Sequence, residues 1–246
     1  MSLLSGPTFE PKHVLVDGDI VAYRAGFASE GKTSADAEDK VDEVMNFIAS
    51  NTMSFPVPDR FHTFLTGTDN FRFEIAKSYP YKGNRSKSEK PEHLQHSRDY
   101  LVSKYKATIS YGEEADDLIA KAATKYGPNT VVASIDKDML QIPCWHYNFG
   151  RDEWSQVDEW GGSKFFYTQI LTGDAADNIK GIKGVGPVKA GKLLKDCTTE
   201  EELWYACLEA YDGDYDRVVE NARLLWLRRR EEELWEPPTV RDGDTQ

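Results

Sequence analysis

The 246-residue chain has few cysteines, no long apolar run and no excess of basic charge. The three cysteines have no metal-ligand spacing, and their odd number argues against a disulfide framework. No apolar stretch approaches the ~20 residues that span a bilayer, and the first residues lack a secretory pattern. We therefore expect a monomeric protein of a reducing cytoplasm, with no membrane partner.

The net charge of −12 conceals two basic stretches. Nine Lys or Arg residues against four acids lie between Arg72 and Lys106, and five lysines without an acid lie between Lys180 and Lys195. Local basic stretches are typical of contacts with phosphate, whatever the sum of the charges. Nucleic acid is therefore a candidate partner.

Short apolar runs alternate with helical periods along the first 160 residues. Strands are expected at 13–16, 61–66 and 130–135, helices at 20–27, 36–50 and 114–126, and a hairpin at 144–149 and 154–157. Such alternation predicts an α/β fold with a mostly parallel sheet and helices on both faces.

Carboxylates gather where the predicted strands end and where the predicted helix at 114–126 begins. Because sites in parallel sheets lie beyond the carboxyl ends of the strands, we expect these groups to meet there. Each group alone could be a turn or a helix cap, whereas their joint occurrence predicts a site. The residues are Asp17 and Asp19, Glu113, Glu114, Asp116 and Asp117, Asp136 and Asp138, and, further along, Asp174 and Asp177.

A cluster of this kind requires cations. Two carboxylates about 5 Å apart repel by roughly 3 kcal/mol at an effective dielectric near 20. Oxygen ligands without histidine or cysteine favour Mg²⁺ or Mn²⁺ over Zn²⁺. Two such ions can activate a water and stabilise the leaving oxygen of a phosphodiester. Lys82 and Arg85 are the candidates for a catalytic cation that stabilises the developing charge.

A glycine turn and several lysines predict a DNA-binding site at 179–195. The turn Gly184-Val185-Gly186 lets backbone N–H groups approach a phosphate, next to a helix that begins near Pro187. Neighbouring lysines would neutralise phosphates without reading sequence. An ordinary helical hairpin with solvated lysines is the alternative. The lysines are Lys183, Lys189 and Lys192.

Six segments between residues 13 and 195 resemble the 5'-3' exonuclease and flap endonuclease family, and its short bacteriophage members most. The resemblance implies a PIN-like nuclease core over residues 1–160, with a helical arch at 72–111. It also implies a helical DNA-binding module over residues 161–246, with a final helical stretch at 220–235, the whole packed as one globular unit. The segments are Val-Asp17-Gly, Tyr81-Lys82-Gly-Asn-Arg85, Glu114-Ala-Asp116-Asp117, Ser-Ile-Asp136-Lys-Asp138, Gly-Asp174-Ala-Ala-Asp177-Asn and Gly-Ile-Lys-Gly-Val-Gly-Pro.

The resemblance also assigns roles to residues. A helix–hairpin–helix at 179–195 would grip duplex DNA, often with a K⁺ ion at its carbonyls. Tyr81 would stack on or steer the DNA near the arch, and Lys87 would also contact DNA. Asp19 and Glu113 fall beside the motif positions and would support the ligands without binding metal. The family usually has a further aspartate after the second strand. That position is Gly67 in this sequence, and Asp69 is the candidate replacement. The first metal would be held by Asp17, Glu114, Asp116 and Asp136, with Asp117 and Asp138 beside them, and the second by Asp174 and Asp177.

The expected function is that of a 5'-3' exonuclease with structure-specific flap cleavage and two Mg²⁺ or Mn²⁺ ions. Its expected substrates are 5' ends, flaps and nicked duplexes of DNA or RNA–DNA hybrid. RNA primer removal in phage DNA replication, in the host cytoplasm, is the expected role. Two alternatives stay open, a PIN-type ribonuclease with the same carboxylates and a non-catalytic protein that binds DNA structures.

Overall fold

The computed structural model describes residues 6–8, 10–53, 58–84 and 89–238. Its chain divides into two compact units. None of the described helices is long and apolar enough to cross a bilayer. The first unit comprises Met1–Asn70, Ser88–Glu159 and Leu227–Glu231, and the second comprises Phe71–Lys87, Trp160–Trp226 and Glu232–Gln246.

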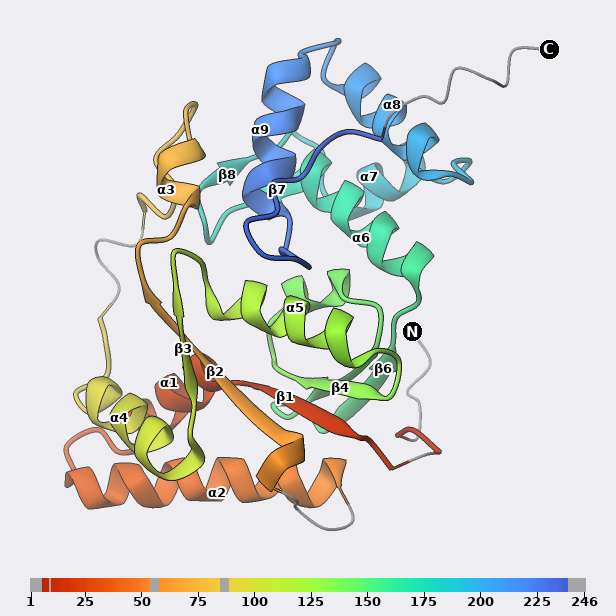
Figure 1. The fold of residues 1–246 in the computed structure, drawn as a ribbon. Coiled ribbons are helices and arrows are strands. Elements are labelled where there is room, and N and C mark those ends of the chain that lie inside the picture. The colour runs from red at the N-terminus through yellow and green to blue at the C-terminus, as the bar shows by residue number, and fades with distance from the viewer. Residues whose placement is uncertain (1–5, 9, 54–57, 85–88, 239–246) are drawn as a thin grey trace. The chain divides into compact units, whose positions relative to one another are not determined.

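A six-stranded sheet of order β3-β2-β1-β4-β5-β6 forms the centre of the first unit (Figure 1). All neighbouring pairs are parallel except β5 and β6, which are antiparallel. The predicted α/β class with a mostly parallel sheet is confirmed. The strands are β1 (His13–Asp17), β2 (Phe61–Thr68), β3 (Thr108–Tyr111), β4 (Thr130–Ala133), β5 (Trp145–Asn148) and β6 (Glu153–Gln156).

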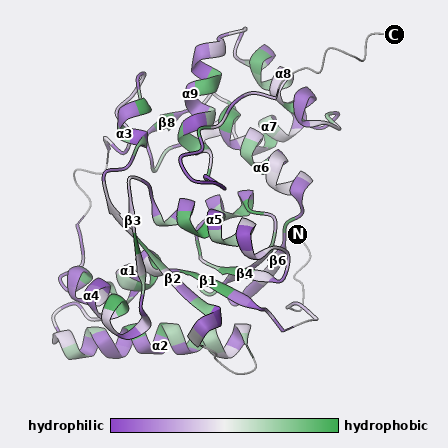
Figure 2. Cartoon of the chain, viewed as in Figure 1, coloured by the Kyte–Doolittle hydropathy of each residue, from purple (hydrophilic) through white to green (hydrophobic). Residues whose placement is uncertain are grey.

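Helices cover both faces of this sheet, and each face has its own apolar core. Val14 and Val16 of β1 pack in the core beneath α1 (Gly18–Ala28), α2 (Ser34–Thr52) and α4 (Leu94–Tyr105). Leu15 packs on the opposite face with α5 (Ala115–Tyr126), because successive strand residues point to opposite sides. Figure 2 shows α2 striped with hydrophilic and hydrophobic residues, as expected of a helix that covers one face.

Two predicted site residues, Asp17 and Asp136, lie between the end of a strand and the beginning of a helical turn. Asp17 ends β1, and its Oδ1 accepts a hydrogen bond from the backbone N–H of Ile20, 3.2 Å away, at the start of α1. Asp136 follows β4 and caps the 3-10 helix Lys137–Gln141. An aspartate is a favoured cap because its oxygen satisfies N–H groups that a helix start leaves unpaired. The caps hold both carboxyl groups at the carboxyl edge of the sheet.

The second unit is mainly helical. Arg72, which is buried, donates from Nε to the carbonyl of Leu224 and from Nη2 to the carbonyl of Trp226, at 2.9 and 2.7 Å. Residues 71–84, predicted as part of an arch on the core, therefore belong to this unit. The elements are α3 (Arg72–Ile75), α6 (Glu159–Thr172), β7 (Gly173–Asp174), β8 (Ile179–Lys180), α7 (Pro187–Leu193), α8 (Glu200–Ala210) and α9 (Tyr215–Leu225).

Two sequence expectations differ from the structure. The final helical stretch, expected at 220–235, ends at Leu225, since Trp226 takes an extended conformation at φ −64° and ψ 129°. Leu227 and Trp235 are buried without being helical, so the sequence resembled a longer helix there. Strand β3 was not predicted, because three of its four residues are exposed and leave no apolar alternation.

Candidate functional site

Asp17 is a buried carboxyl group with an abnormal pKa. It is 3% exposed, and its Oδ2 accepts a hydrogen bond of 2.8 Å from the Ser134 hydroxyl. Burial, together with the charges of Asp19 and Asp136, raises the pKa of Asp17 to about 7, against the hydrogen bonds that lower it. The group therefore lacks the positive charge that would keep a buried carboxylate ionised at neutral pH.

Asp116 faces the same electrostatic problem. Burial raises the pKa of Asp116 well above its usual value, and the charges of Asp17, Glu114, Asp136 and Asp117 add to the shift in that order. Glu114 is buried, whereas Asp136 and Asp138 are half-buried. Four of the residues predicted as ligands, from the ends of β1 and β4 and the start of α5, are therefore close enough to repel one another.

These carboxylates do not already form a closed cage. Among the described residues, no three histidine, cysteine, aspartate or glutamate side chains are gathered as metal ligands. Asp136 instead uses Oδ1 to accept a 2.9 Å hydrogen bond from the N–H of Asp138. The donor set is nevertheless all oxygen, as Mg²⁺ or Mn²⁺ requires, and a divalent ion would supply the missing positive charge.

Ser134 joins two of the predicted ligands, and sequence reasoning missed it. Its hydroxyl donates to Asp17 and accepts a 3.0 Å hydrogen bond from the N–H of Asp136. The side chain is 7% exposed and follows β4 directly. Its place two residues before Asp136 was the only signal in the sequence. Ser134 fixes the spacing between the ends of β1 and β4.

Asp19 and Glu113, which fall beside the predicted ligands, are both paired with basic side chains. Arg98 of α4 forms a short ion pair with Asp19, which also accepts a 2.8 Å hydrogen bond from the N–H of Thr66. Glu113 pairs with Lys121 at 2.5 Å and with Arg228 at 3.7 Å. Both carboxylates thereby support the fold around the site.

Asp117, also predicted as a ligand, has both carboxylate oxygens engaged by backbone. Its Oδ2 accepts from the N–H of Glu114 at 3.1 Å, and its Oδ1 from the N–H of Arg228 at 3.0 Å. The residue is fully buried. These bonds fix the start of α5, and with it the neighbouring Asp116, while direct ligation by Asp117 stays a prediction.

The absence of an acid at Gly67, where the family usually has one, has a steric reason. A Cβ atom at Gly67 would come within 2.0 Å of the carbonyl oxygen of Ser110 on β3. No side chain fits there without moving β3. Asp69, the candidate replacement, is exposed in the left-handed region at φ 63° and accepts 3.0 Å from the Thr68 hydroxyl. Its role as a ligand stays a prediction.

Asp174 and Asp177 lie in the second unit, on the turn between β7 and β8. The Oδ1 of Asp174 accepts from the N–H groups of Ala176 at 2.7 Å and Asp177 at 3.4 Å. Lys82, the predicted catalytic lysine, has its Nζ 3.8 Å from Oδ2 of Asp177, and its backbone N–H donates to the Asp177 carbonyl. The structure thus joins the Tyr81-Lys82 motif to this acidic pair.

Tyr81 requires a correction. Its ring is 4% exposed and packs in the apolar core of the second unit, so it does not present a face on which a base could stack. Its hydroxyl donates to Oδ2 of Asp177 at 2.7 Å. Tyr81 therefore positions an acid instead of stacking on DNA. Arg85 and Lys87, predicted for catalysis and DNA contact, lie outside the described residues.

The glycine turn at 184–186 lies next to exposed lysines, and DNA binding by them stays a prediction. Gly184 has φ 79°, which only glycine adopts without strain, and Gly186 caps α7 with Pro187 at its first turn. Val185 buries its side chain, so only its backbone is available to a ligand. The segment before the turn is the short β7–β8 pair and not a helix. Exposed lysines on and before α7 are Lys183, Lys189 and Lys192.

Comparison with known proteins decides the family. The model of the 5'-3' exonuclease N-terminal resolvase-like domain matches residues 12–158. The chain belongs to this family. A 5'-3' exonuclease of Mycoplasma genitalium is 26% identical over 221 residues, covering 78% of this chain and 75% of its own length. DNA polymerase I of Thermus aquaticus is 28% identical over 224 residues, or 80% of this chain. The chain spans 26% of that polymerase's length.

Solved structures show the same fold. The T5 D15 protein crystallised with metal ions gives a TM-score of 0.66 at 16% identity, over 86% of this chain and 88% of its own. The D15 flap endonuclease in complex with DNA and metal ions gives 0.59 at 17% identity, over 84% and 91%. The family and its fold agree with the family that the motifs resembled.

Proposed function

We propose that this exonuclease-family chain is a divalent-metal-dependent 5'-3' exonuclease and flap endonuclease that hydrolyses phosphodiester bonds by a two-metal mechanism. The observation that carries the proposal is the mutual repulsion of Asp17 and Asp116, two carboxyl groups with raised pKa values beside Glu114 and Asp136. Buried acids without compensating cations weaken a fold, so their presence has a functional explanation.

Mg²⁺ or Mn²⁺ fits this donor set. Asp17, Glu114, Asp116 and Asp136 would hold one ion, with Asp138 beside it, and Asp174 and Asp177 would hold the other. When bound, the ions would lower the pKa of a water and stabilise charge on the phosphate oxygens. That D15 crystals contain metal ions supports the same requirement here.

The chain's own residues would place and polarise the substrate. Lys82 would donate to a phosphate oxygen as negative charge develops, and its present partner Asp177 would exchange it for a metal ion. Tyr81 would keep Asp177 oriented during that exchange. Ser134 would hold Asp17 and Asp136 at a fixed separation.

The glycine turn and the lysines of α7 would bind the duplex backbone without reading sequence, and K⁺ at the turn's carbonyls is part of the proposal. Substrates would be 5' ends, flaps and nicked duplexes. We extend the proposal to RNA–DNA hybrid and hence to RNA primer removal in phage replication, with the protein acting as a monomer. The D15 complex with DNA supports a DNA substrate.

Cleavage of 5'-labelled substrates tests the proposal. A 5' flap, a nicked duplex and an RNA–DNA hybrid are incubated with Mg²⁺, with EDTA, and with the double variant Asp136→Ala plus Asp138→Ala. Asp39→Ala, which changes an exposed acid of α2, is the matched control. We expect short 5' products and flap release that need Mg²⁺, disappear in the double variant and persist in Asp39→Ala.

Two other outcomes would replace the proposal. Preferential cleavage of single-stranded RNA would identify a PIN-type ribonuclease. Tight flap binding without turnover after Mg²⁺ is added would identify a non-catalytic protein that binds DNA structures. Unchanged cleavage by the double variant would remove the carboxylates from the mechanism.

A further inference from the structure

A cavity of about 720 Å³ lies in the first unit beside the amino-terminal half of β2. Its walls include Met45 and Ala49 of α2, Phe61 and Phe64 of β2, and Ala122 of α5. The parallel pairing of β1 with β2 places Val14 opposite Phe61 and Asp17 opposite Phe64. The cavity is therefore beside the starts of the strands, whereas the proposed carboxylate site lies at their carboxyl ends. Nothing in the proposed hydrolysis uses it.

The cavity exposes an open sheet edge. Strand β3 covers the outer edge of β2 only from Phe64, which pairs with Thr108, onward. Among the described residues, no strand pairs with that edge at Phe61–Thr63. Alternate residues of a strand direct N–H and C=O groups to each side, so this edge offers backbone donors and acceptors. Proteins often bind an extended peptide at such an edge.

An unsatisfied hydroxyl supports the presence of a ligand. Thr63 is 2% exposed and lines the cavity. Its Oγ1 has no hydrogen-bond partner among the described residues. A buried hydroxyl without a partner costs about 1–3 kcal/mol, which a peptide along Phe61–Thr63 would recover when the Thr63 side chain rotates toward it.

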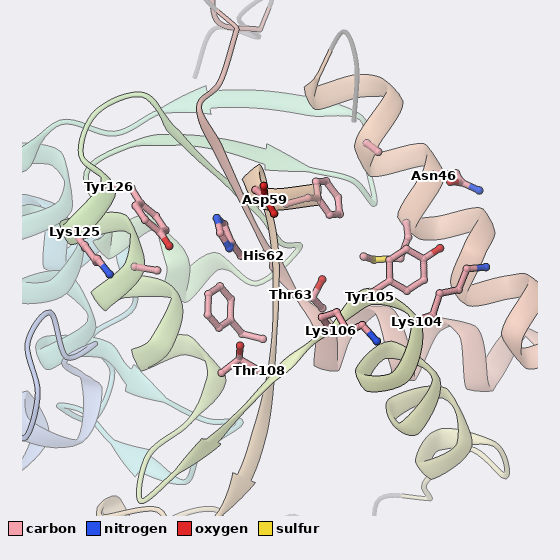
Figure 3. A pocket seen from close by; sticks show the side chains of 15 residues that line it. Asn46, Asp59, His62, Thr63, Lys104, Tyr105, Lys106, Thr108, Lys125 and Tyr126 are labelled. Carbon is pink, nitrogen blue, oxygen red and sulfur yellow. The ribbon is translucent and has the colours of Figure 1, made fainter. Parts of the chain in front are cut away.

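The charge around the cavity is basic, in a chain of net charge −12. Figure 3 shows Lys125 on one side of β2, with Tyr126 and His62, and Lys104 and Lys106 on the other. Asp59 is the one acid among the lining residues. Lys104 is partly neutralised by Asp42, 2.5 Å away, which leaves Lys106 and Lys125 as the principal charges.

We propose that this edge binds an extended acidic peptide segment of a partner protein, which pairs with Phe61–Thr63 of β2. The peptide would continue the line of β3, place an apolar side chain against Met45, and direct carboxylates toward Lys106 and Lys125. Apolar walls with separated cations suit such a segment better than a compact anion. Since the cavity lies away from the carboxylate site, binding would leave hydrolysis possible.

Fluorescence anisotropy with a synthetic peptide tests the proposal. The probe is a capped, labelled ten-residue peptide that alternates glutamate with valine and carries a central phenylalanine. We expect saturable binding that weakens with added NaCl, because charge contributes. The double variant Lys106→Asp plus Lys125→Glu should weaken binding about tenfold or more, whereas Lys40→Glu in α2, which does not line the cavity, should not. Aspartate is chosen at Lys106 because φ there is 55°.

Hydrogen exchange supplies the second readout, which does not depend on the variants. Bound peptide should slow exchange of amides within Phe61–Thr63, and a peptide with alternate N-methylated residues should neither bind nor protect them. The proposal is overturned if the N-methylated peptide binds equally well, if the double variant folds and binds normally, or if protection appears elsewhere. It is also overturned if a single-stranded oligonucleotide, and not the peptide, protects these amides.

Discussion

Single carboxyl groups of the first unit, those of Asp17 and Asp116, are unfavourable in the folded state when they are ionised. Asp116 has a raised pKa, so its charged form opposes folding. Stability is therefore fully present at pH values below the unfolded pKa near 3.8, and it is lost as the pH rises through the folded pKa. A neutral residue of the same shape at position 116 should not lose stability as the pH rises. A divalent ion bound to the wild type should offset the loss.

Asp116→Asn should therefore raise the free energy of unfolding by about 1 kcal/mol or more at pH 8 in EDTA, while it abolishes flap cleavage. Urea denaturation and the cleavage assay measure the two effects. Asp39→Asn should change neither. A variant that is less stable than the wild type in EDTA would show that Asp116 is already compensated without metal.

His146 on β5 should make the stability depend on acid pH. Burial lowers its pKa to about 4, while the carbonyl of Ile142 accepts a 2.8 Å hydrogen bond from its Nε2. Its contribution is complete above the unfolded pKa near 6.5 and is lost as the pH falls toward 4. The shift corresponds to about 3 kcal/mol.

Urea midpoints at pH 7 and pH 4.5 check this prediction. The difference between the two midpoints should be smaller in His146→Gln than in the wild type, because glutamine keeps a donor and does not titrate. His93→Gln, at a half-buried histidine that precedes α4, is the control. An equal pH dependence in all three proteins would contradict the assignment.

At the scale of elements, the β2–β3 pair shows what sequence patterns miss. Gly67 approaches the carbonyl of Ser110 too closely for any Cβ. Gly67→Ala should therefore destabilise the protein by about 2 kcal/mol or more, as measured by urea denaturation. Gly191→Ala should have a neutral or stabilising effect, since Gly191 lies in α7 with open space around its Cβ position. Similar effects of both variants would contradict the close contact.

Helix α7 should contribute salt-dependent DNA affinity. Lys189→Ala and Lys192→Ala should each weaken binding to a nicked duplex similarly for all sequences, and each should reduce the slope of log K against log salt by about 1. Anisotropy titrations at several KCl concentrations measure this, with Lys40→Ala as control. A loss that depends on the DNA sequence would assign these lysines to base contacts.

Much of the first unit could be predicted because its signals are local. The apolar middles of β1 and β4 are followed closely by acids, Asp17 and Asp136, and α5 has a clear helical period. Contacts between distant residues could not be predicted. Ser134 and Arg98 meet their carboxylate partners across 117 and 79 positions of sequence. Tyr81 was predicted to face DNA because an aromatic residue beside a lysine gives no sign of its burial.

At the scale of the whole molecule, two compact units divide the predicted ligands between them. Asp17, Glu114, Asp116 and Asp136 belong to the first, and the turn with Asp174 and Asp177 belongs to the second, beside Lys82. The overall negative charge of −12 does not exclude nucleic-acid binding, because part of it comes from the proposed metal ligands, which bound divalent ions would neutralise. The proposed nuclease depends on these acids holding divalent ions.

Counting bound Mn²⁺ by electron paramagnetic resonance tests that dependence most directly. The wild type should bind two ions per chain, the double variant Asp17→Asn plus Asp116→Asn should lose one, and Asp174→Asn plus Asp177→Asn should lose the other. Asp39→Asn should still bind two. No saturable binding by the wild type, or an unchanged count in both double variants, would contradict the account.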